Sequence, residues 1–79
     1  MSPYSDGEPV VGVIDADLSM LHLHLPGSEE PPEHKYLHRG EVVVVLCVKV
    51  GLANVQYYEV LTRHGIGWLW IFDVKYEIP

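Results

Sequence analysis

Residues 41–50 read EVVVVLCVKV, and this stretch decides the fold of the chain. Its apolar side chains, most of them valine, occupy both the odd and the even positions of the segment. β-Branched side chains favour the extended backbone of a strand. A strand that is apolar on both faces is typical of the interior of a sheet. The segment therefore predicts a central strand that is covered on both sides.

The residues that follow predict a hairpin and a closing strand. The predicted elements are a turn at residues 51–54, strands at 55–61 and 66–70, a link at 71–73 and a strand at 74–78. Arg63, His64 and Gly65 predict the tight turn of the hairpin, in which Gly65 adopts a positive φ. Gly67, just before Trp68, is expected to allow a close strand crossing, because glycine has no Cβ.

On the N-terminal side, residues 20–25 (MLHLHL) alternate strictly, which predicts a strand. Its expected faces are Leu21, Leu23 and Leu25 on one side, and Met20, His22 and His24 on the other. Residues 26–34 (PGSEEPPEH) hold three prolines and a glycine, so we expect an exposed acidic loop. Val10–Ile14 predicts a short first strand, and residues 1–9 predict a flexible arm.

These segments amount to about five to six short strands, with no helical periodicity of useful length. The predicted fold is a small all-β antiparallel barrel or sandwich, with one domain over residues 10–79. The chain of 79 residues is 48 % hydrophobic and 20 % charged, which excludes a disordered protein. Its single cysteine, Cys47, cannot form an intrachain disulfide and is expected to be a small buried hydrophobe.

Charge is unevenly distributed along the chain. Residues 1–34 contain seven acids and no Lys or Arg, whereas residues 35–79 contain four acids and five bases. A net charge of −6 repels phosphate, so nucleic acid is not expected as a partner. A protein with a basic surface is the better electrostatic match.

No export signal or membrane span is expected. The first basic residue is Lys35, whereas a signal peptide begins with a basic region. The longest apolar run, residues 42–48, is far shorter than the ~20 residues that span a bilayer. The sequence therefore predicts a soluble cytoplasmic protein with no membrane partner.

Candidate chemistry is sparse. His22 and His24 share a predicted strand face, and such a pair can supply two zinc ligands, but no cysteine pair or HExxH motif accompanies them. Surface histidines are the preferred interpretation, and we expect no metal and no other cofactor. No serine lies beside a histidine–acid pair, and the paired carboxylates at residues 29–30 belong to a predicted loop, so no enzyme is expected.

The order of features from Leu21 onward resembles the bacterial SH3 family. The matching segments are LHL at 21–23, PGS at 26–28, LHRGE at 37–41, VVVVL at 42–46, YYEV at 57–60 and GIGWL at 65–69. The resemblance covers about three quarters of the chain, and it rests on order and spacing rather than on any single motif. The density of YYEVLT, GIGWLW and FDV also weakly resembles small SH3-like accessory proteins of bacteriophages, whose location would be the host cytoplasm or the virion.

The resemblance implies a ligand groove between the long first loop and the turn after the valine-rich strand. The residues that it implies for protein binding are Tyr57, Trp68 and Trp70, with Glu29, Glu30 and Glu33 at the rim. Residues 70–73 (WIFD) depart from the Pro-Ser-Asn-Tyr segment of eukaryotic SH3 domains. Neither recognition of PxxP peptides nor a specific cell-wall ligand is therefore implied.

The aromatic residues near the C-terminus support a binding surface independently. The set is Tyr57, Tyr58, Trp68, Trp70, Phe72 and Tyr76. Alternate residues of a strand face opposite sides, so one core cannot hold all of these rings, and Trp and Tyr dominate interface hot spots. An aromatic core whose excess rings are half-covered by the N-terminal arm is the competing interpretation.

The sequence thus predicts a non-enzymatic protein-interaction module or accessory protein, with an aromatic anchor and an acidic selector loop. Two alternatives stay open. One is a self-associating structural subunit, such as a phage virion component, and the other is a small acidic inhibitor of a host enzyme.

Overall fold

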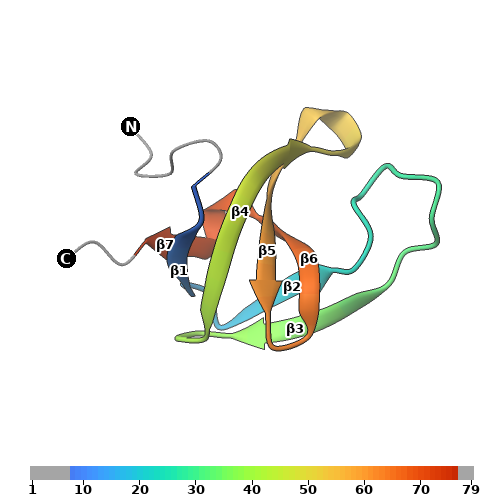
Figure 1. Ribbon diagram of the computed structural model, residues 1–79. Helices are drawn as coiled ribbons and strands as arrows, with labels where there is room; N and C mark the ends of the chain where they lie inside the picture. Colours follow the sequence, from blue (N-terminus) through green and yellow to red (C-terminus); the bar gives the residue numbers. More distant parts are fainter. Residues whose placement is uncertain (1–7, 77–79) are drawn as a thin grey trace.

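The computed structural model describes residues 8–76, and these form a domain built from strands (Figure 1). The elements are β1 (Val10–Ile14), β2 (Leu18–His22), β3 (His34–His38), β4 (Val42–Val50), η1 (Leu52–Asn54), β5 (Gln56–Thr62), β6 (Gly65–Trp70), η2 (Ile71–Asp73) and β7 (Val74–Tyr76). Both η elements are single 3-10 turns. The predicted all-β class is confirmed, with seven strands instead of five to six.

All seven strands belong to one antiparallel sheet in the order β3-β2-β6-β5-β4-β1-β7. β4, β5 and β6 run side by side, and β2 and β3 run crosswise below them (Figure 1). The first and last strands pair through Gly12 with Tyr76 and Ile14 with Val74. This pairing brings the two ends of the described chain to the same side of the molecule.

β4 is an interior strand of the sheet, as expected, and it lies between β5 and β1. Only one of its faces is buried, however. Val43 and Val45 point into the core and are almost completely inaccessible, whereas Val42 is 63 % exposed. The prediction of a strand covered on both sides is wrong, because the strand preference of valine comes from its shape and holds on an open face too.

A β-bulge interrupts the pairing of β4 with β5 between Val45 and Cys47. Beyond it, Val48 pairs with the buried Tyr58, and Cys47 pairs with Glu59. Cys47 is half-buried, and its thiol donates a hydrogen bond to Oε1 of Glu59 at 2.9 Å. The expectation that Cys47 acts only as a buried hydrophobe therefore needs correction, since it also bonds a carboxylate.

The N-terminal hairpin differs from its prediction in two ways. β2 begins at Leu18 and ends at His22, so it lies two to three residues earlier than the predicted segment 20–25. The second strand, β3, was not predicted, and it pairs with β2 from His38 opposite Leu18 to His34 opposite His22. The residues between the two strands form the predicted long loop.

The core is one cluster of side chains drawn from nearly every strand. Its buried hydrophobic members are Ile14, Leu21, Leu37, Val43, Val45, Tyr58, Val60 and Leu69. Leu23 packs against this cluster from just beyond β2, although it lies outside the strand. Ser19 is the one wholly buried polar residue of the described range.

The predicted turns are largely confirmed. Gly65 has φ 94° in the turn between β5 and β6, the value that favours glycine. The predicted link at 71–73 is η2, and the predicted turn at 51–54 contains η1. Glu8 and Pro9 of the predicted arm are exposed, while its residues 1–7 lie outside the described range, as does Ile78 of the predicted last strand.

Candidate functional site

Tyr57, Trp68 and Trp70 lie on one face of the β5–β6 hairpin. Tyr57 pairs directly with Trp70, and Glu59 pairs with Trp68. The alternate residues Tyr58 and Leu69 point into the core. Because side chains alternate across a strand, the three rings point away from the core together.

Two further rings extend this group. His22 of β2 approaches Tyr57 edge-on at 5.6 Å between ring centroids, and Phe72 of η2 approaches Trp70 edge-on at 4.9 Å. Trp70 is 47 % exposed and Phe72 70 % exposed, whereas Tyr57 and Trp68 are half-buried. Tyr57, Trp68, Trp70 and Phe72 together are named the aromatic patch. Edge-to-face contacts fix such rings in place.

Two hollows lie near the aromatic patch, and Trp70 and Phe72 line the second of them. The first, of about 440 Å³, is lined by residues 25–28 of the long loop and 50–54 around η1. The second, of about 300 Å³, is lined by residues 54–56 and 70–72. A Cβ on Gly51 would lie only 2.9 Å from Cε2 of Tyr57, so the ring packs directly over this glycine. The absence of a side chain at Gly51 keeps this position open to the Tyr57 ring.

The patch is anchored through Asp73, the last residue of η2. The hydroxyl of Ser19 in β2 donates to Oδ2 of Asp73 at 2.7 Å, and the amide of Asp15 donates to the Asp73 carbonyl at 2.8 Å. These bonds hold η2, and with it Phe72, against the β1–β2 connection. The two side chains are 54 positions apart in the chain, so no local sequence pattern predicts the pair.

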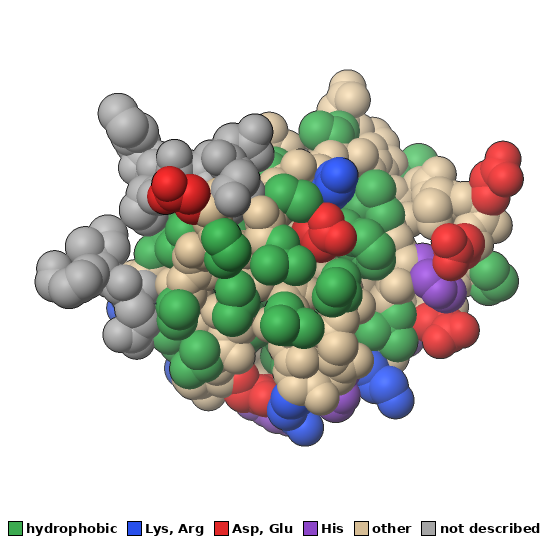
Figure 2. Space-filling view, in the orientation of Figure 1, with side chains coloured by type: hydrophobic (Ala, Val, Ile, Leu, Met, Phe, Trp, Pro, Cys, Tyr) green, Lys and Arg blue, Asp and Glu red, His purple; other side chains and the backbone are tan. Residues whose placement is uncertain are grey.

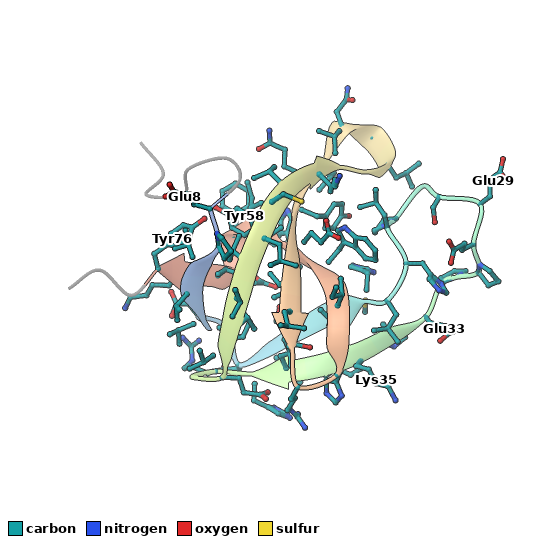
Figure 3. The ribbon with its side chains drawn as sticks, viewed as in Figure 1. Glu8, Glu29, Glu33, Lys35, Tyr58 and Tyr76 are labelled. Atoms are coloured by element: carbon teal, nitrogen blue, oxygen red, sulfur yellow. The ribbon has the colours of Figure 1, made fainter. Side chains whose placement is uncertain are left out.

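The three predicted acidic residues lie on the long loop and outside the aromatic patch. Glu29 and Glu33 are exposed, and the loop that carries them extends beyond the sheet (Figure 3). Glu30 forms an ion pair with Nε2 of His24 at 3.0 Å, while Nδ1 of His24 lies 2.6 Å from the carbonyl oxygen of Pro31.

The structure separates the two histidines that the sequence suggested as zinc ligands. The strand ends at His22, so His24 does not share its face and instead contacts the loop through Glu30. His22 pairs directly with His34 of β3 on one side and with Trp68 of β6 on the other. Over residues 8–76, no group of three or more His, Cys, Asp or Glu side chains is arranged to hold a metal ion.

Burial beside the aromatic patch lowers the pKa of His22 below its ordinary value, and the nearby His34 lowers it further. The unfolded chain, in which histidine titrates near ~6.5, therefore takes up this proton more readily than the folded chain does. The stability contribution of neutral His22 is present above about pH 6.5 and is lost as the pH falls below that value.

We expect wild-type protein to lose stability between about pH 7 and pH 5.5, and His22→Gln to lose less over the same interval. Urea unfolding midpoints at each pH measure the difference between the two proteins. Equal losses in both would show that His22 does not contribute to this dependence.

No helix among the described residues has the length and apolar character needed to cross a membrane. No protein-family model matches this sequence, and no significant similarity to a curated protein or to a solved structure was found.

Proposed function

We propose that this chain is a non-enzymatic protein-interaction module with an SH3-like fold. The aromatic patch anchors a peptide segment of a protein partner, and Glu29, Glu30 and Glu33 select partners with a basic surface. The observation that carries the proposal is the pairing of Tyr57 with Trp70 on the outer face of the β5–β6 hairpin. Large exposed rings that their neighbours hold in fixed orientations are typical of interface hot spots.

The hollow that contains Gly51, on which the Tyr57 ring packs, supports a ligand site next to the aromatic patch. It lies between the long loop and the turn after β4, where the resemblance to SH3 domains puts the ligand groove. The backbone amide of Leu52 donates to the carbonyl of Pro26 at 2.9 Å, which joins the two walls of the hollow at its base. A groove whose walls are already connected loses little conformational entropy when a ligand binds.

The acidic loop supports a basic partner. Glu29 and Glu33 are solvent-exposed, so their charges act on an approaching molecule before contact. Charges at the rim of an interface mainly accelerate association, and salt screens them. The loop therefore selects partners by association rate, while the aromatic patch supplies most of the affinity.

A displayed library of short peptides tests the proposal, with the immobilised protein as bait. We expect the selected peptides to carry Lys or Arg beside an apolar residue. Binding of one selected peptide, measured by fluorescence anisotropy, should weaken by about 2 kcal/mol or more in Trp70→Ala, which is about 30-fold in Kd. The free energy of unfolding should change by under about 1 kcal/mol, because Trp70 is half exposed.

Tyr36→Ala is the matched control. Tyr36 is an exposed ring on β3, outside the aromatic patch, with a similar exposure of 41 %. Its removal should leave peptide affinity unchanged. Replacement of Glu29, Glu30 and Glu33 by Lys should slow association at low salt, and added salt should reduce that effect. Selection of acidic peptides, or wild-type affinity in Trp70→Ala, would refute the proposal.

A further inference from the structure

A second group of exposed apolar side chains lies beside the aromatic patch, on the same outer face of the sheet. Val11 of β1, Val44 of β4, Leu61 of β5 and Ile66 of β6 are direct neighbours in the strand register, each opposite the next. These four residues are named the aliphatic row. Val42, opposite Val13, extends the row at one side. The row thus runs unbroken across four adjacent strands.

The aliphatic row is open to solvent. Val11, Leu61 and Ile66 are 49 %, 46 % and 51 % exposed, and Val42 is 63 % exposed. Figure 2 shows hydrophobic side chains gathered over the face formed by β1, β4 and β5. An apolar patch of this extent, on the order of 500 Å², is at the large end for a monomer and marks an interaction surface.

Two charged residues near the aliphatic row have contacts within the molecule. Glu59, on the same face of β5 as Leu61, keeps its negative charge and accepts a hydrogen bond from the thiol of Cys47, and Arg63 forms an ion pair with Glu41. The row itself contains no charged residue. The row itself offers a charged partner no group to pair with, whereas a second copy presents the same uncharged row.

The position of the acidic loop also suits a second copy. The protein carries a net charge of −6, so two copies repel each other unless their acidic groups stay apart. Glu29 and Glu33 lie on the long loop, which extends to the side of the sheet away from β1 (Figure 3). Two copies that meet at the row can keep these loops at a distance.

We propose that the aliphatic row is the contact face of a symmetric dimer of this chain. A two-fold axis lets one patch serve both copies, as isologous interfaces require. Two such faces bury on the order of 1,000 Å² in total, which is at the low end for specific interfaces. The dimer is therefore weak and depends on concentration.

Sedimentation velocity from about 1 µM to about 1 mM protein tests this proposal. Wild-type protein should shift from monomer to dimer across that range. Leu61→Glu and Leu61→Lys, each measured alone, should weaken association at least about tenfold, because like charges then meet across the axis. An equimolar mixture of the two variants should recover the dimer, because the opposite charges attract.

Three comparisons make the result specific. Leu52→Glu introduces the same charge at a leucine of η1 that is 66 % exposed and outside the row, so it should dimerise like wild type. Trp70→Ala should also dimerise normally, which separates this surface from the aromatic patch.

Circular dichroism melts identify folded variants, and Ile66→Thr provides a milder change if either Leu61 variant unfolds. A wild-type monomer at the highest concentration, failure of the mixture to recover the dimer, or loss of the dimer in Trp70→Ala would overturn the proposal.

Discussion

Leu69→Ala is expected to lower the free energy of unfolding by about 2–5 kcal/mol. Leu69 is completely inaccessible to solvent and lies in the core cluster, opposite the buried Tyr58 of the neighbouring strand. Its truncation removes apolar surface from the core and leaves a cavity that a rigid sheet cannot close. Because small domains are stable by only about 5–15 kcal/mol, the larger losses in this range leave part of the protein unfolded at room temperature.

Urea unfolding, followed by tryptophan fluorescence, measures this loss. Trp70→Ala is the matched control, because residue 70 is adjacent in the chain but on the opposite face of β6. It should cost under about 1 kcal/mol, although it removes a larger side chain. Equal losses in the two variants would show that burial does not differ between these faces as the structure describes.

The elements that the sequence predicts well are those with strong local signals. The valine-rich residues 41–50 predict a strand, and the structure has β4 at Val42–Val50. Gly65 predicts a hairpin turn, because its positive φ is unfavourable for residues other than glycine. Once that hairpin is predicted, alternation brings Tyr57 and Trp70 to one face, as the structure shows. The shared face of Tyr57 and Trp70 can be predicted from the sequence, because it depends only on the alternation of side chains along two strands and on the position of one turn.

The errors arise where partners distant in the sequence decide the outcome. The sequence around β3 is polar and follows Pro31 and Pro32, and the strand exists because β2 supplies hydrogen-bond partners along its length. The local sequence also does not reveal that one face of β4 is exposed to solvent. Valine favours the backbone of a strand whether its side chain is buried or exposed. The contact of His22 with Tyr57 and the bond of Ser19 with Asp73 are likewise products of tertiary folding.

The crossing of β2 over β6 was anticipated from Gly67, and its geometry makes a second strong prediction. A Cβ on this residue would lie 2.7 Å from the carbonyl oxygen of His22 and 2.7 Å from Cδ1 of Leu21. Leu21 is fully buried, and the carbonyl belongs to the backbone of β2, so neither group can move aside on its own. Relief of the clash requires the β2–β3 hairpin to separate from β6.

Gly67→Ala should therefore destabilise the protein by at least about 2 kcal/mol, in the upper part of the range for overpacked cores.

Substitutions at two other glycines show whether the clash with β2 causes this loss of stability. Gly40→Ala introduces a methyl group into open space at φ 89°, so it should cost only the left-handed backbone penalty of about 1–2 kcal/mol. A Cβ on Gly12 would lie 2.7 Å from Cγ1 of Val74, a side-chain atom, whereas Gly67 also meets backbone at 2.7 Å, so Gly12→Ala should cost less than Gly67→Ala. Urea unfolding ranks the three variants, and amide hydrogen exchange should show the largest loss of protection in β2 and β3 for Gly67→Ala. Unchanged exchange there, together with wild-type stability, would mean that β2 and β6 do not approach each other as closely as the structure describes.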